Sequence, residues 1–322
     1  MEPRHRTFVT FAWLNVGYNL LVIMWGAFVR ATGSGAGCGD HWPLCDGQVI
    51  PRAPDTAQLI EFSHRVTSGI ALLLTIVLLV WALRLFAAGH PARRAAIAAM
   101  VLMIVESLIG AALVLFRLVA HDASMTRALS LGLHLINTFL LIGAMALTAW
   151  YAGGKPAPDL RGKGGLLAML IAALVGTALV GSSGAVTALG DTLLQLGVLP
   201  GGVSQPINRD SHPLVLMRII HPVLGTLVGL AMISLAQRAM RYDPSPTTRR
   251  LAWATATIFV GQIFLGALNV MLKAPVWMQL IHLLFADLAW LALVLLSATL
   301  LARPSDVRIA HSVSASTPVR SV

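Results

Sequence analysis

Eight long apolar stretches constrain this sequence more than any other feature. The first, Thr7 to Val29, runs for 23 residues without a charge, and a membrane-crossing helix needs about 20 mostly apolar residues. Seven further stretches lie at about 58–84, 95–117, 127–151, 165–188, 213–237, 250–272 and 276–302. No run alternates as a barrel strand would, and helices satisfy every backbone polar group inside lipid. The sequence therefore predicts an all-α integral membrane protein with eight transmembrane helices.

Composition excludes the soluble alternatives. Of the 322 residues, 57% are hydrophobic and 11% are charged, whereas a soluble domain carries about 25% charged residues. A cleaved signal peptide is the rival interpretation of the first stretch, because Arg4 and Arg6 precede it. Signal-peptide cores run for about 7–15 residues, which is shorter than this stretch. We therefore interpret it as a retained span.

The net charge of +10 is interpreted as a topology signal. Fifteen of the 23 Lys and Arg residues fall in the N-terminus, the even-numbered loops and the C-terminal tail. The positive-inside rule places these segments in the cytoplasm. We thus expect a multi-pass protein of a bacterial inner membrane with both termini cytoplasmic, and no binding to nucleic acid.

The two halves of the chain resemble each other. His221 follows His64 by 157 positions and His282 follows His134 by 148, with similar apolar residues around each. Such self-similarity indicates a repeat architecture. We predict two tandem four-helix bundles related by a pseudo-two-fold axis along the membrane normal, formed by residues 1–154 and 155–303. Residues 304–322 are expected to form a disordered cytoplasmic tail.

Four histidines lie inside predicted spans, namely His64, His134, His221 and His282. Each follows the start of an even-numbered helix by six to eight residues, about 10 Å along the axis, so all four are expected in one layer toward the outer surface. A lone buried histidine is commonly a packing residue, but two per half at one depth favour metal ligation. Haem iron takes axial histidines, whereas structural zinc takes four ligands on one ion. We predict two b-type haem sites, His64 with His134 and His221 with His282.

Arginines near the outer helix ends are candidates to bind haem propionates, because guanidinium groups bind carboxylates through two hydrogen bonds. Simple interfacial snorkelling is the alternative. The candidates are Arg30, Arg65, Arg209 and Arg218.

Charged residues in the spans distinguish the halves. Glu61 lies three residues before His64, on one helical face, and its repeat counterpart is Arg218. A carboxylate there can stabilise charge or move protons, although a salt bridge to Arg65 or Arg30 is equally compatible with the spacing. Glu106 corresponds to Gln262 in the second half, and both a packing role and a proton path remain open for it.

The first outer loop carries the two cysteines, Cys38 and Cys45. The outer side of a bacterial membrane is oxidising, so a disulfide is expected there. It is either structural or exposed enough for thiol exchange, and the six intervening residues argue against a zinc ribbon. The loop after the fifth span has no cysteine.

Three segments together resemble the haem A synthase family. They are Gly26-Ala-Phe-Val-Arg-Ala-Thr-Gly-Ser-Gly35, Cys38 with Trp42-Pro-Leu-Cys45-Asp-Gly-Gln, and Ile60-Glu-Phe-Ser-His-Arg65. The resemblance extends from about residue 8 to 302 and includes the eight spans, the tandem halves and the four histidines.

The resemblance implies a function for each half. The family oxidises the C8 methyl group of haem O to the formyl group of haem A, for terminal cytochrome oxidases. The second half would hold a haem b cofactor on His221 and His282. The first half would receive the substrate haem near His64 and His134, with Glu61 needed for the reaction.

The resemblance also implies partners. These are haem O synthase (protohaem farnesyltransferase), which acts upstream, and an external electron donor or acceptor. The sequence leaves homo-oligomer formation open. The rival functions are a dihaem electron-transfer cytochrome that leaves both haems unmodified, and a repeat-built transporter that holds no pigment.

Overall fold

The computed structural model describes residues 3–202, 207 and 211–302 and confirms the all-α architecture. Within these described residues, eight helices are long and apolar enough to cross a membrane. They are α1 (Pro3–Ala31), α2 (Thr56–Leu85), α3 (Pro91–Leu115), α4 (Met125–Ala152), α5 (Gly164–Gln195), α6 (Pro213–Tyr242), α7 (Pro246–Met271) and α8 (Val276–Leu300). The predicted tail, residues 304–322, lies outside the described residues, as does Arg209.

Most helices extend beyond the stretches predicted from apolar length. Hydropathy marks the part of a helix that lies in hydrocarbon, whereas capping groups set where the helix itself begins. The Asp55 side chain accepts a hydrogen bond from the Gln58 amide at the start of α2, and the Ser124 side chain caps α4 in the same way. At its C-terminal end, α5 continues seven residues past the predicted stretch, to Gln195.

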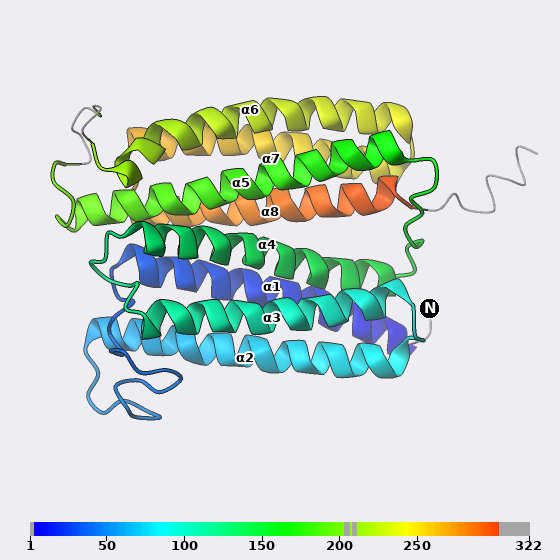
Figure 1. Cartoon of the computed structure of the whole chain (residues 1–322). Helices are drawn as coiled ribbons and strands as arrows, with labels where there is room; N and C mark the ends of the chain where they lie inside the picture. The colour runs from blue at the N-terminus through cyan, green and yellow to red at the C-terminus, as the bar shows by residue number, and fades with distance from the viewer. Residues whose placement is uncertain (1–2, 203–206, 208–210, 303–322) are drawn as a thin grey trace, which may run out of the picture.

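The helices form two groups of four (Figure 1). Helices α1–α4 lie together on one side and α5–α8 on the other, and the groups meet where α1 and α4 pack against α5 and α8. The start of α1 and the end of α8 lie at one end of the molecule, and the long α1–α2 connection lies at the opposite end. The two-fold relation between the groups and the division at residue 154 stay predictions.

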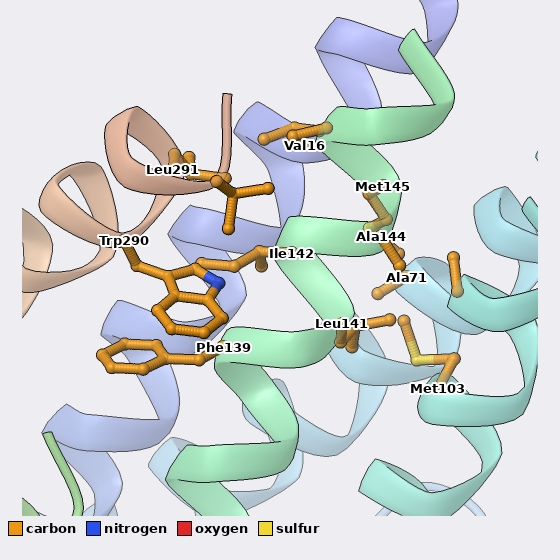
Figure 2. Packing of buried hydrophobic residues seen from close by; sticks show 13 residues of the cluster. Val16, Ala71, Met103, Phe139, Leu141, Ile142, Ala144, Met145, Trp290 and Leu291 are labelled. Carbon is orange, nitrogen blue, oxygen red and sulfur yellow. The ribbon is translucent and has the colours of Figure 1, made fainter. Parts of the chain in front are cut away.

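Aromatic stacking fills the centre of the seam between the two groups. Phe139 of α4 and Trp290 of α8 stack with ring centroids 5.1 Å apart and an interplanar angle of 14°. Figure 2 shows these rings beside Ile142 and Leu291, with Val16 of α1 close by. Such dense packing leaves little freedom for one group to slide on the other. These contacts therefore join α4 and α8, the helices that carry His134 and His282.

Candidate functional site

The two histidines of the second half face each other. The His221 and His282 rings have centroids 6.3 Å apart and planes at 88°. In the first half, the His64 ring lies against Gly26 of α1, and Gly110 of α3 lies near the His134 ring. The helices thus bring together the predicted pair of the second half, and the pairing of His64 with His134 stays a prediction.

Hydrogen bonding distinguishes the ring nitrogens. The Nδ1 atom of His221 lies 3.0 Å from the Ser183 hydroxyl of α5. A partner on Nδ1 fixes the orientation of an imidazole and leaves Nε2 available to a metal. The Nδ1 atoms of His64, His134 and His282 are buried and have no hydrogen-bond partner among the described residues. Ser183 was not predicted from the sequence, since a serine in an apolar span has no distinguishing pattern.

The second-half pair fits a haem iron held between two imidazoles. Two metal–nitrogen bonds of about 2 Å, each extended by about 1.1 Å to the ring centre, separate the centroids by about 6 Å. The His221–His282 separation of 6.3 Å matches this value. No group of three or more His, Cys, Asp or Glu in the described part of the chain is arranged to hold a metal ion. The ring separation is compatible with a two-histidine site, and haem ligation by His221 and His282 remains a prediction.

A glycine of the preceding helix lies against each of the four imidazoles. A Cβ atom added to Gly26 would lie 2.9 Å from Cε1 of His64, and one added to Gly184 would lie 2.9 Å from Cε1 of His221. The other two contacts are looser: Gly266 to His282 at 3.4 Å and Gly110 to His134 at 4.0 Å. Sequence reasoning did not identify these glycines as a set, although the repeat register relates Gly184 to Gly26 and Gly266 to Gly110.

Glu61 connects α2 to the outer loop. Its carboxylate is buried, with 4% exposed, and accepts hydrogen bonds from the Cys38 amide at 2.8 Å and from the Arg65 guanidinium at 2.5 Å. Arg65 also donates to the carbonyl oxygens of His41 and Leu44 in that loop. The salt bridge that we considered for Glu61 therefore forms with Arg65, one turn along the same helix.

The outer loop is closed by the predicted disulfide. Cys38 and Cys45 are bonded to each other, and both side chains are buried. Gly37 lies so close to α2 that a Cβ atom there would be 2.5 Å from the backbone of Ala57 and Gln58. The disulfide loop is thus held on the first turns of α2, near His64.

The described candidate arginines, at the end of the molecule that carries the α1–α2 loop, have protein partners. Arg30 of α1 crosses the seam and donates to the Ala188 carbonyl and Thr192 hydroxyl of α5, both at 2.8 Å, and to the Gln279 side chain of α8 at 2.9 Å. Arg218 of α6 forms an ion pair with Asp191 of α5 at 3.0 Å. Propionate binding by Arg30, Arg65 and Arg218 remains a prediction.

Glu106 lies beside the second histidine of the first half. One carboxylate oxygen is 3.4 Å from Nε2 of His134, and the carboxylate accepts hydrogen bonds from Asn137 at 2.6 Å and Thr138 at 2.5 Å. In the second half, the Gln262 amide donates to the His282 carbonyl at 3.0 Å. A carboxyl group therefore lies beside one histidine pair at a position where the other half has an amide.

The fold and the site together define the class of protein. In its described residues it is a helical membrane protein with eight spans and two histidines within the spans of each half. A family model described as cytochrome oxidase assembly protein matches residues 9–294. The chain belongs to this family, COX15-CtaA.

Curated relatives fall under two names. A Thermus thermophilus protein named "Protoheme IX farnesyltransferase" is 47% identical over 293 residues, which are 91% of this chain and 48% of that protein. "Heme A synthase" of Halalkalibacterium halodurans is 32% identical over 71% of this chain and 75% of its own length. "Heme A synthase" of Symbiobacterium thermophilum is 30% identical over 83% and 87%. The chain spans about half the length of the Thermus relatives and most of the other two.

Proposed function

We propose that this protein is a haem A synthase, an oxidoreductase that converts the C8 methyl group of haem O to a formyl group. The observation that carries the proposal is the histidine pair in each half combined with Glu61 and Glu106 in the first half, where the second half has Arg218 and Gln262 at the same repeat positions. The name "Heme A synthase" of two relatives that the chain largely covers supports it.

In the second half, His221 and His282 would hold a haem b cofactor, with Ser183 orienting His221. Arg218 would bind a propionate near its ion pair with Asp191. When bound, this haem supplies one-electron transfer.

In the first half, His64 and His134 would hold the substrate haem, and Arg30 and Arg65 would be propionate ligands. Written with one water molecule as the oxygen source, conversion of the methyl group to an aldehyde releases four electrons and four protons. Two hydroxylations followed by loss of water achieve this change. The oxygen source and the electron donor or acceptor are external partners of the chain.

Glu61 would stabilise positive charge or accept protons during this reaction. Its carboxylate has fixed donors in Arg65 and the Cys38 amide, so it needs no reorganisation when charge develops nearby. The disulfide loop lies over α2 at this point and would shield the carboxylate from outside water. In the second half, Arg218 stands at the same repeat position and forms an ion pair with Asp191 of α5.

The upstream partner would be haem O synthase, a protohaem farnesyltransferase. Chains of Thermus thermophilus with that name contain a region 47% identical to this protein within about twice the length. Fusion into one polypeptide would bring the supplier of haem O next to its consumer. We further propose that the protein lies in a bacterial inner membrane, with both termini cytoplasmic and the haem sites toward the outer surface.

Pigment extraction tests the reaction. The chain is expressed together with a protohaem farnesyltransferase in cells that otherwise make no haem A, and the extracted haems are identified by mass. We expect haem A. Haem B and haem O alone, from a folded protein, would instead support the dihaem electron-transfer cytochrome, and a colourless protein would support the transporter.

A further inference from the structure

Each candidate haem ligand touches a glycine on the preceding helix, and the closeness of the contact follows a definite order. Added Cβ atoms would lie 2.9 Å from the His64 and His221 rings, 3.4 Å from the His282 ring and 4.0 Å from the His134 ring. Real Cβ atoms essentially never approach a heavy atom within 3.0 Å. The present positions of the His64 and His221 rings therefore require glycine at Gly26 and Gly184. The position of the His134 ring does not require glycine at Gly110.

The contacts centre on Cε1, the ring carbon between the two nitrogens, so each glycine also lies close to the nitrogen Nε2 that would bind iron. The Cβ atom added to Gly26 would lie 3.1 Å from Nε2 of His64, and that added to Gly184 would lie 3.4 Å from Nε2 of His221. A side chain at either position would push the ring away or stand beside the nitrogen that binds iron. Bare backbone at these points leaves the nitrogen accessible.

We propose that Gly26 and Gly184 are positioning residues for the two haems: they let the imidazoles of His64 and His221 lie directly on α1 and α5 with Nε2 unobstructed. Gly266 has the same role to a lesser degree for His282. This inference rests on the proposed function, because it assumes that the histidines are haem ligands.

Glycine in a helix has a second explanation, close packing of the helices themselves. The chain offers matched controls for it, because an added Cβ atom on Gly17 of α1 or Gly261 of α7 would meet nothing within 4 Å. Alanine is also the better helix former by about 1 kcal/mol. A loss of haem in Gly26→Ala or Gly184→Ala cannot therefore come from weaker helix propensity.

The experiment measures haem binding rather than turnover. Full-length Gly26→Ala, Gly110→Ala, Gly184→Ala and Gly266→Ala proteins, with Gly17→Ala and Gly261→Ala as controls, are purified in detergent and titrated with haem B. Folding is checked by helicity and size-exclusion profile. Occupancy is followed by absorbance, and electron paramagnetic resonance reports ligation by two imidazoles.

We expect Gly184→Ala to weaken the second-half site about tenfold or more, in the range seen when groups supporting metal ligands are lost, and to leave the first-half site unchanged. Gly26→Ala should weaken the first-half site by a similar factor and leave the second-half site unchanged. Gly266→Ala should have a smaller effect, and Gly110→Ala and both controls almost none. If Gly184→Ala does not fold, the Gly266→Ala result decides for the second half.

Wild-type affinity and spectra in Gly26→Ala and Gly184→Ala would overturn the inference and leave the proposed function intact. Equal losses in the Gly17→Ala and Gly261→Ala controls would also overturn it. A wild-type protein that binds no haem would instead refute the proposed function, so the two failures are distinguishable.

Discussion

The two halves carry equivalent histidine pairs in different electrostatic surroundings. In the first half, Glu61 lies under the disulfide loop and Glu106 contacts His134. In the second half, Arg218 and Gln262 stand at these two repeat positions. The two copies of the histidine pair therefore differ in the residues at two equivalent positions, and the second half has its own acidic residue, Asp191, which pairs with Arg218.

The sharpest test of this comparison removes one ligand at a time. His221→Ala or His282→Ala should abolish the resident haem b spectrum, because a single remaining imidazole no longer holds the iron from both sides. His64→Ala should retain that spectrum. Absorbance spectra of the purified proteins measure this, and loss of the resident haem in His64→Ala alone would reverse our assignment of cofactor and substrate to the halves.

Glu61→Ala should separate haem binding from reaction. We expect both haems to bind but haem A formation to fall about 100-fold or more, as when a charged or proton-transferring group is removed from an active site. Extraction and mass analysis of the haems measures the product. Glu61→Gln is the matched variant, since it keeps the side-chain size and removes the charge. Normal product from both variants would exclude Glu61 from the mechanism.

Arg30→Ala tests whether this residue joins the halves or binds a propionate. Loss of its hydrogen bonds across the seam should lower the free energy of unfolding by about 2–4 kcal/mol, even in protein without haem. The control is Arg117→Ala, which removes an exposed ion pair with Asp40 and should cost no more than about 1 kcal/mol. Thermal unfolding in detergent measures both, and destabilisation confined to haem-loaded protein would assign Arg30 to the propionate instead.

The two single variants Glu106→Gln and Gln262→Glu should produce the smallest effect of this series, a shift in haem midpoint potential. We propose that Glu106 is ionised when haem is bound. Because a negative charge near the iron favours the oxidised state, Glu106→Gln should then raise the midpoint potential of the first-half haem by on the order of 50 mV. Gln262→Glu should lower that of the second-half haem by a similar amount. Redox titration followed by absorbance measures both values. Unchanged potentials in the two variants would show that these positions do not distinguish the halves.

Much of this architecture could be predicted from the sequence, because span length and apolar content respond directly to the bilayer. The histidine pairs could also be predicted, since the repeat register relates His64 to His221. Helix ends could not, because they depend on capping groups such as Asp55 and Ser124 rather than on hydropathy.

Contacts set by helix rotation and loop path were beyond the sequence. Spacing alone allowed Glu61 to pair with Arg65 or Arg30, and only the structure shows Arg30 turned toward α5 and α8. The hydrogen bond from the Cys38 amide depends on how the disulfide loop folds back. The contact of Gly26 with His64 depends on the rotation of α1 against α2.

The most direct test is an experimental structure, by electron cryo-microscopy, of the protein purified with its native pigment. We predict density for a flat tetrapyrrole between His221 and His282, with Nε2 of both rings on the iron. We also predict a second cavity, wide enough for a tetrapyrrole, between His64 and His134. Imidazoles that turn apart or toward lipid, with no tetrapyrrole between them in a coloured preparation, would contradict it.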